Sequence, residues 1–260
     1  MKLLRTASWL VAGLILQLTA LPAEASPLYA ADSTLFSVNS STGASSAIDS
    51  GDPAYRLGLA WNELTNTMYS LGSFNGTLST VDLTTGNTTV VGDNNFTLTG
   101  LAFDTTFSNL YSLNGNGGAL VRMNPSNASA VVVGGGSNFM LDLSMNSAGV
   151  LYGGGVTGIG TFNLTTGAFT PIGPTSFFWT AIAFNEFDEL FGVEVSSDAL
   201  YRIDPLTGAA TLVGGDIGND VRGMSFAPQS VPVPEPASMT LLGIGLAGLG
   251  ARRWRQRRNS

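Results

Sequence analysis

A pattern of about forty residues, repeated five times, constrains the fold of this chain more than any other feature of its sequence. Each copy contains a short segment in which large and small residues alternate. These segments are 58–62, 100–104, 142–146, 181–185 and 223–227. A period of two, with large apolar side chains on one face and Gly, Ala or Ser on the other, is typical of a β-strand that is tightly packed on both faces. Self-similarity at this period indicates an array of like units.

Three further strands are predicted in each repeat. The second strand carries a Leu-Tyr pair or a close variant, as at Leu110 and Tyr111. The third alternates polar and apolar residues, as in 200–203, and the fourth ends in Val-Gly or Ile-Gly at Gly92, Gly134, Gly173 and Gly214. Each unit is therefore expected to be a four-stranded antiparallel sheet.

The turn between the third and fourth strands carries a recurring Asn or Asp. These residues are Asn39, Asp82, Asn124, Asn163 and Asp204. A glycine stands four residues later in every copy except the one with Ala128. An Asn or Asp side chain can accept a hydrogen bond from the backbone two residues on, and a glycine supplies the positive φ that closes a hairpin. We therefore expect a structural role for these positions and no metal site.

The order of the strands predicts an all-β fold, a five-bladed β-propeller. The sequence after the N-terminal segment begins on a second strand, at Leu28, and the last repeat ends on a first strand that starts at Gly223. One C-terminal and three N-terminal strands would then complete a blade and close the ring without open edges. A β-solenoid is the alternative, but its rungs are shorter and parallel. The repeats resemble those of bacterial propellers of the NHL and quinoprotein-like type, especially at 204–208, and this resemblance implies a fold and no activity.

The N-terminal segment is predicted to be a signal peptide, residues 1–25. Lys2 and Arg5 precede an apolar run, 7–18, and Ala23-Glu24-Ala25 forms a small-x-small cleavage site that makes Ser26 the expected mature start. A core helix is the alternative for this run. The propeller domain is then expected to span 26–230.

The C-terminal segment, 231–260, combines three features in a fixed order. A proline-rich linker is followed by an apolar run, 239–251, and then by five arginines, beginning with Arg252 and Arg253. This order predicts an extended linker, a short transmembrane helix and a cationic end that stays in the cytoplasm.

This segment resembles the PEP-CTERM sorting tail of exported proteins of Gram-negative bacteria. The signature residues are Pro234, Glu235 and Pro236. The resemblance implies export, transient insertion in the inner membrane through the C-terminal helix, and processing by an exosortase-type enzyme. The expected destination is the cell surface or the extracellular matrix.

The composition of the predicted domain excludes several functions. Between residues 26 and 230, four arginines stand against sixteen Asp and Glu, a net charge of −12. Such a domain is a poor partner for nucleic acid or an anionic membrane surface. The chain has no Cys and no His, which excludes disulfides, the usual zinc sites and histidine-dependent triads. We expect no cofactor and no metal. The glycine runs 134–136 and 153–155 lack the context of a phosphate loop and are predicted to be loops or turns.

Candidate binding residues are sought where the repeats differ from one another. The connections between blades are expected to gather on one face, and aromatic rings beside carboxylates and amides suit a sugar, because a ring can cover its apolar C–H groups. The candidates are Trp179, Phe178, Asp142, Glu194, Asp220, Arg56 and Arg222. Trp179 is expected to be exposed. Phe178 recurs near one repeat position with Tyr55, Phe96 and Phe139, and the alternative for it is packing between blades. The alternative for the charged candidates is surface charge and ion pairing between blades.

Two hypotheses on function remain. The first is a non-catalytic propeller displayed outside the cell, which binds polysaccharide or another surface component. The second is a polysaccharide-active enzyme, a glycosidase or lyase, with Asp142 and Glu194 as the candidate pair of carboxylates.

Overall fold

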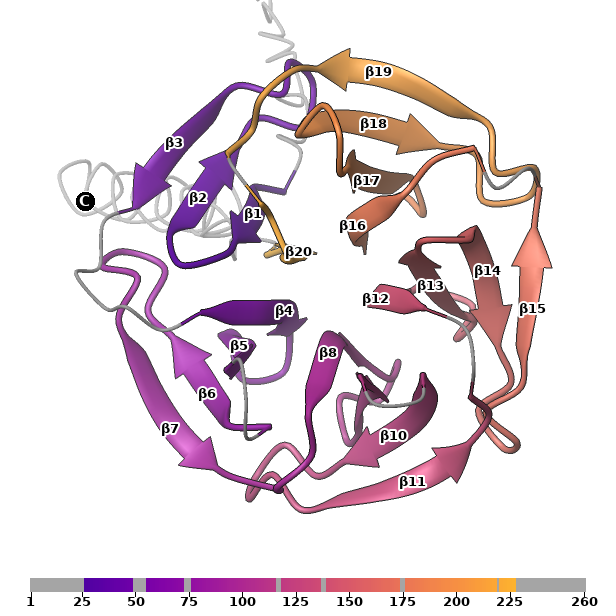
Figure 1. Ribbon diagram of the computed structural model, residues 1–260. Helices are drawn as coiled ribbons and strands as arrows, with labels where there is room; N and C mark the ends of the chain where they lie inside the picture. Colours follow the sequence, from indigo (N-terminus) through magenta and orange to yellow (C-terminus); the bar gives the residue numbers. More distant parts are fainter. Residues whose placement is uncertain are drawn as a thin grey trace, which may run out of the picture.

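The computed structural model describes residues 26–48, 55–72, 76–115, 118–136, 139–173, 176–218 and 220–227. These residues form five four-stranded antiparallel sheets arranged as blades around a central axis (Figure 1). The predicted all-β, five-bladed propeller is confirmed. The predicted signal peptide and C-terminal tail lie outside the described residues. Among the described residues, no helix has the length and apolar character needed to cross a membrane.

Each blade runs from an inner strand at the axis to an outer strand at the perimeter (Figure 1). The first blade contains β20 (Gly223–Phe226), β1 (Leu28–Ala31), β2 (Leu35–Val38) and β3 (Ser45–Ile48). The second contains β4 (Arg56–Asn62), β5 (Thr67–Gly72), β6 (Leu78–Val81) and β7 (Thr88–Gly92). The third contains β8 (Leu98–Phe103), β9 (Leu110–Asn114), β10 (Ala119–Met123) and β11 (Ala130–Gly134). The fourth contains β12 (Met140–Met145), β13 (Leu151–Gly155), β14 (Gly158–Phe162) and β15 (Phe169–Ile172). The fifth contains β16 (Trp179–Phe184), β17 (Leu190–Glu194), β18 (Ala199–Ile203) and β19 (Ala210–Gly214).

The ring closes by pairing the two ends of the domain, as the sequence predicts. β20 and β1 are antiparallel neighbours, with Leu28 opposite Phe226 and Ala31 opposite Gly223. The N–H of Ala227 donates to the Pro27 carbonyl at 3.0 Å and extends the pairing beyond the strands. The first blade therefore takes one strand from the C-terminal end of the domain and three from its N-terminal end.

Apolar clusters fill the five boundaries between neighbouring blades. At the boundary between the fifth and first blades, the rings of Phe191 and Phe226 have centroids 5.4 Å apart. Met224, also on β20, is buried in the same cluster. Burying an aliphatic or aromatic side chain of this size stabilises a fold by about 1.5–3 kcal/mol. The closing strand thus contributes apolar contacts to this boundary as well as backbone hydrogen bonds to β1.

The predicted structural role of the recurring turn is confirmed. Asp82 Oδ1 accepts a hydrogen bond from the Thr84 N–H at 2.7 Å, and Asp204 Oδ1 accepts one from the Leu206 N–H at 2.8 Å. Asn163 makes the same bond to the Thr165 N–H at 2.9 Å, so an amide serves as well as a carboxylate. Ala128 adopts a φ of 60° where the other copies have glycine.

The inner strands touch one another around the axis. Gly58, Gly100, Asp142, Ala181 and Gly223 occupy the same position in the five repeats. A Cβ atom at Gly100 would lie 2.7 Å from Asp142 Cα, and one at Gly223 would lie 2.6 Å from Gly58 Cα. Because real Cβ atoms do not approach backbone so closely, larger residues are excluded at these glycines.

Asp142 is the one acidic residue among these five equivalent positions, and it is fully buried. Its Oδ2 accepts a hydrogen bond from the Ile182 N–H of the next inner strand at 2.9 Å. Two residues along β12, Ser144 Oγ accepts the Phe184 N–H at 2.9 Å. Side chains of β12 therefore satisfy two N–H groups of β16, the inner strand of the next blade.

The Asp142 carboxyl is held in an environment that disfavours its charge. Burial raises its pKa well above the usual range, while the N–H groups of Ile182, Leu143, Leu101 and Met224 act in the opposite direction. Oδ1 is buried and has no hydrogen-bond partner among the described residues. Of the four N–H groups, that of Ile182 has hydrogen-bonding geometry, so the burial effect prevails.

Replacing Asp142 by Asn tests whether this carboxyl titrates in the folded protein. A raised pKa means that folding favours the protonated form. That stabilisation is complete below the pKa of the unfolded side chain, about 3.9, and is lost as the pH rises through the folded value. Asn keeps an oxygen for the Ile182 N–H but does not titrate. The melting temperature of the wild type should therefore fall relative to that of Asp142→Asn as the pH increases from about 4.

Asp204→Asn is the control for this series. Backbone hydrogen bonds, first that from Leu206, lower the pKa of Asp204, so its contribution to stability is present at neutral pH and is lost as the pH falls. The melting temperature of the wild type should therefore rise relative to that of Asp204→Asn as the pH increases, which is the opposite of the trend expected for Asp142→Asn. A constant difference between wild type and Asp142→Asn at every pH would show that Asp142 does not titrate.

Deleting residues 221–230 from the domain 26–230 tests the closure of the ring. The deletion removes β20, leaves one edge of β1 unpaired and opens the cluster that contains Phe191. We expect loss of the cooperative thermal transition, followed by circular dichroism. An unchanged transition would mean that the closing strand is dispensable.

Candidate functional site

The structure buries four of the seven candidate binding residues. Trp179, Arg56 and Asp142 are buried almost completely, and Glu194 is 9% exposed. Phe178 and Arg222 are half-buried, and Asp220 is exposed. The candidates therefore do not form one open face.

The expectation of an exposed Trp179 is wrong. This residue is the first of β16 instead of part of a loop, and it is 1% exposed. Its ring stacks on Phe177 at 5.0 Å and meets Tyr201 edge-on at 5.7 Å. A Cβ at Gly192 would lie 2.9 Å from Trp179 Cε3, so the glycine makes room for the indole. Trp179 is a core residue at the boundary between the fourth and fifth blades.

The glycine run 153–155 packs against Trp179 from the neighbouring blade. The prediction that this run forms a loop or turn is wrong. These residues form the second half of β13 and are buried. A Cβ at Gly154 would lie 3.2 Å from Trp179 Cβ. A strand of small residues on one blade thus accommodates a large side chain of the next.

Arg56 connects the first two blades. Its Nη2 donates to the Gly86 carbonyl at 2.7 Å, and its Nη1 donates to the Ser33 carbonyl at 3.3 Å. Arg222 forms an ion pair with Asp220. Arg56 therefore stabilises the ring from inside, whereas Arg222 lies at its surface.

Glu194 holds its own turn. Its Oε2 accepts hydrogen bonds from the N–H and Oγ groups of both Ser196 and Ser197, at 2.7 to 3.1 Å. Burial acts to raise the pKa of Glu194, but these hydrogen bonds outweigh it and lower the pKa. The proposed pairing of Asp142 with Glu194 as two reacting carboxylates is not supported, since one is enclosed at the axis and the other is occupied by its turn.

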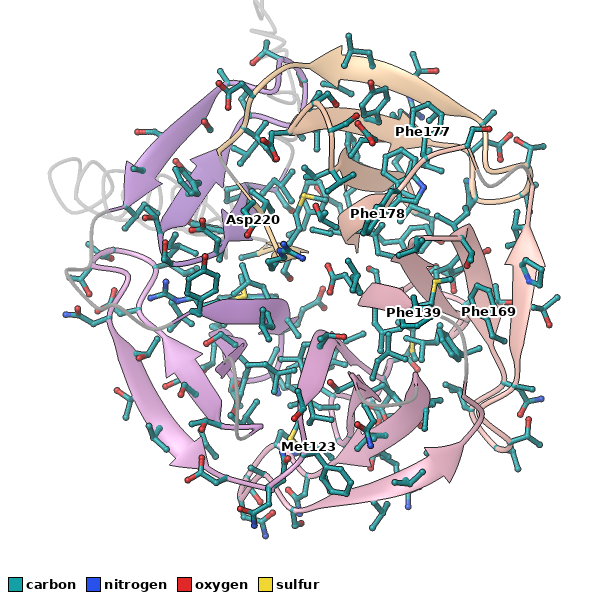
Figure 2. The ribbon with its side chains drawn as sticks, viewed as in Figure 1. Met123, Phe139, Phe169, Phe177, Phe178 and Asp220 are labelled. Carbon is teal, nitrogen blue, oxygen red and sulfur yellow. The ribbon has the colours of Figure 1, made fainter. Side chains whose placement is uncertain are left out.

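The accessible candidates lie at the end of the ring where the chain enters the inner strands. Figure 2 shows Phe178 and Asp220 near the axis on this face. Phe139, in the corresponding connection of the fourth blade, is 72% exposed. A binding role for Phe178, Asp220 and Arg222 stays a prediction.

A hollow of about 370 Å³ opens at the other end of the inner strands. Its walls are formed by the last residues of these strands, Trp61, Phe103, Met145, Phe184 and Phe226. Its rim is formed by the turns that lead from the inner strands to the second strands, and these contribute Glu63, Asp104, Phe107, Asn146, Glu186 and Asp188. Aromatic rings, amides and carboxylates thus converge at the mouth of the axis.

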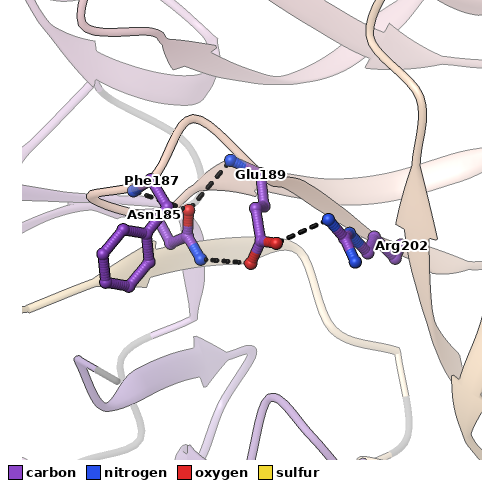
Figure 3. A network of polar contacts seen from close by, with 4 residues as sticks. All are labelled: Asn185, Phe187, Glu189 and Arg202. Carbon is purple, nitrogen blue, oxygen red and sulfur yellow. Dashed lines mark hydrogen bonds and ion pairs between the residues drawn. The ribbon is translucent and has the colours of Figure 1, made fainter. Parts of the chain in front are cut away.

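Hydrogen-bonded turns position the rim. In the fifth blade, Asn185 Oδ1 accepts the N–H groups of Phe187 and Glu189 at 3.0 and 2.9 Å, and Asn185 Nδ2 donates to Glu189 Oε2 at 2.8 Å (Figure 3). Glu189 Oε1 also forms an ion pair with Arg202 of β18 at 2.5 Å. This network fixes the turn that carries Glu186 and Asp188.

The buried Asp142 does not line the hollow. Leu101, Leu143 and Met224 do line it, and the N–H groups of the same three residues act on the Asp142 carboxyl. Residues of the inner strands therefore separate Asp142 from the hollow.

The charge of the hollow is negative. Four carboxylates line it, and none of the four arginines of the domain does. Among the described residues, no group of three Asp or Glu side chains has a geometry suited to a metal ion. The site can accept hydrogen bonds and stack apolar faces, which suits a hydroxylated or cationic ligand.

The rim residues were missed in the sequence because Asp104 and Asn146 end repeated segments, where they are expected to serve the turn, and the others stand just after such segments. The one available signal is the recurring large residue at the end of each inner segment, as in Trp61 and Phe103. That pattern predicts packing equally well. Only the closed ring brings the five positions together around one opening.

Comparison with solved structures supports the fold. One chain in the crystal structure of a nidogen/laminin complex is 11% identical, with 78% of this chain and 98% of that chain covered and a TM-score of 0.56. A structural genomics protein of unknown function from Bacteroides thetaiotaomicron VPI-5482 is 14% identical, with 77% and 60% covered and a TM-score of 0.54. At these identities the likeness shows the fold alone. No curated protein sequence matches the chain.

The tail gives the information on sorting. Residues 232–258 match the model of the PEP-CTERM protein-sorting motif. This motif implies export, anchoring in the membrane at the C-terminus and processing by an exosortase. The chain therefore carries a PEP-CTERM sorting motif on the C-terminal side of a five-bladed β-propeller.

Proposed function

We propose that this protein is a non-catalytic binding module, displayed at the surface or in the extracellular matrix of a Gram-negative bacterium, that binds polysaccharide in the central hollow. The sorting motif supports display outside the cell. After processing, the propeller is the part of the chain left to interact with its surroundings. The acidic composition of this domain suits an uncharged or cationic partner better than an anionic one.

The observation that carries this proposal is the composition of the hollow. Trp61 is half-buried in its wall, so part of the indole remains available for stacking on a sugar ring. Glu63 is exposed on the rim and offers a carboxylate to hydroxyl groups. The inner strands that carry these groups are held by their close contacts around the axis at positions such as Gly58 and Gly100, so the site is largely formed before a ligand binds.

The enzyme hypothesis has no comparable support from a particular observation. The carboxylates proposed for it, Asp142 and Glu194, do not line the hollow.

A glycan array with the domain 26–230 tests the proposed function. Wild type should bind one or more polysaccharide fragments. Trp61→Ala should weaken that binding about five-fold or more, because truncation of an aromatic anchor costs over ~1 kcal/mol.

Phe139→Ala is the matched control, since it truncates an exposed aromatic side chain at the opposite end of the ring that is not among the seven candidates. It should leave the affinity unchanged. Loss of binding in Phe139→Ala but not in Trp61→Ala would move the site to that opposite end, and absence of binding across the array would refute a polysaccharide partner.

Mass spectrometry of the protein released from the cell surface tests the proposed sorting. We expect a first residue near Ser26 and loss of the residues that follow Pro236. An extracellular protein that retains 252–260 would show that the tail is not processed.

A further inference from the structure

We infer that the fold binds the new N-terminus that signal cleavage creates, because Glu186 on the turn after β16 pairs with the α-ammonium group of Ser26. The domain then gains stability when the peptide bond between Ala25 and Ser26 is cut. Neither the pair nor its test depends on a ligand in the hollow.

Ser26 lies at the seam where the two ends of the domain meet. It is 8% exposed, and its nitrogen donates a hydrogen bond to Glu186 Oε1 at 3.1 Å. The carbonyl of the next residue, Pro27, accepts the Ala227 N–H at 3.0 Å, and β1 pairs with β20 from the following residue on. The backbone is therefore held in place from the expected first residue of the mature chain onward.

The turn after β16 uses each of its three carboxylates for a different contact. Asp188 accepts two hydrogen bonds from Ser147, on the turn after β12, at 2.8 and 2.5 Å. Glu189 forms an ion pair with Arg202 of β18 at 2.5 Å. The third carboxylate, Glu186, accepts the hydrogen bond from the N-terminal segment. A turn that is fixed on two sides thus presents one carboxylate to the start of the domain.

Cleavage changes the chemical state of the Ser26 nitrogen. Hydrolysis of the Ala25–Ser26 bond by a signal peptidase consumes one water. The oxygen of this water joins the Ala25 carbonyl carbon, which leaves as a carboxylate, and both hydrogens end on the nitrogen, which becomes an ammonium group. An α-amino group has an ordinary pKa of about 7.7–8.0, so it carries a charge at neutral pH. A neutral amide donor is thus replaced by a cation beside the Glu186 carboxylate.

The new charge strengthens the contact between the first and fifth blades. A hydrogen bond between charged groups is about twice as strong as one between neutral groups. Because Ser26 is largely buried, an ammonium group there requires a carboxylate partner. Glu186 is exposed, so solvent screens part of the attraction and the gain is modest. The pair nevertheless acts at the boundary that β20 closes, next to the cluster that contains Phe226.

The composition of the mature chain allows a direct test. Lys2 is the one lysine of the sequence and lies in the predicted signal peptide, so the chain 26–260 contains a single amine, that of Ser26. Acetic anhydride converts this amine to an amide, which removes the charge and keeps an N–H as in the precursor. Acetylation should lower the melting temperature of the chain 26–260 in detergent by about 2 °C, as expected for a partly exposed ion pair in a domain of this size.

Glu186→Gln removes the charge of the partner and keeps an oxygen that can accept the hydrogen bond. The free-amine form of this variant should melt no higher than its acetylated form. The matched control is Glu63→Gln, which occupies the same position of the repeat on the turn after β4 and is exposed like Glu186. The control should keep the difference of about 2 °C between the free and acetylated forms.

The rate of acetylation provides a second measurement that does not depend on stability. An ammonium group must lose a proton before it reacts, and a neighbouring carboxylate favours the charged form. At pH 7 the amine should therefore react about two-fold faster or more in Glu186→Gln than in the wild type, and at the wild-type rate in Glu63→Gln.

Equal melting temperatures of the free and acetylated wild type would overturn the inference. A difference that persists in Glu186→Gln would also overturn it, because another group would then bind the N-terminus. Equal losses in Glu186→Gln and Glu63→Gln would show a general effect of the acidic rim instead of a specific pair.

Discussion

The close approach of the five inner strands is the constraint on which the rest of the structure depends. At Gly58, Gly100 and Gly223 a single added carbon would collide with the backbone of the next inner strand. Such contact closes the axis at this level. Asp142 lies at the same level and accepts the Ile182 N–H of the next inner strand. Because the axis is closed at this level, the hollow can form only beyond it, toward the ends of the inner strands.

Close backbone contact also joins neighbouring blades at the perimeter of the propeller. The glycines that end the outer strands, Gly92, Gly134, Gly173 and Gly214, each lie against the third-to-fourth-strand turn of the next blade, where a Cβ would collide with a carbonyl oxygen. At the boundary between the first and second blades, the guanidinium of Arg56 contacts the corresponding turn through the Gly86 carbonyl. Each blade thus contacts its neighbour at the axis and at the perimeter, and an apolar cluster lies between these two contacts.

The sequence predicts the fold better than the site, for a physical reason. Alternation, turn residues and the offset start are local patterns, and they correctly predict the blades, the structural role of Asp82 and the pairing of β20 with β1. The environment of Trp179 depends on glycines of a neighbouring blade, and a large aromatic side chain is equally suited to a core and to a sugar. Departure from a repeat therefore identifies unusual positions such as Asp142, but it does not distinguish a ligand site from a structural adjustment.

Scaffold and recognition are separated within the turns that form the rim. An asparagine stands at or directly after the end of three inner strands, and its side chain accepts a backbone N–H group that fixes the turn. These residues are Asn62, Asn146 and Asn185. The residues that follow them, such as Glu63 and Glu186, are exposed. Substitutions at outer positions such as Glu63 can change the charge and shape of the hollow without disturbing the ring. In the proposed binding function, ligand preference is set by a few turn residues, while the contacts between the inner strands keep their backbone in place.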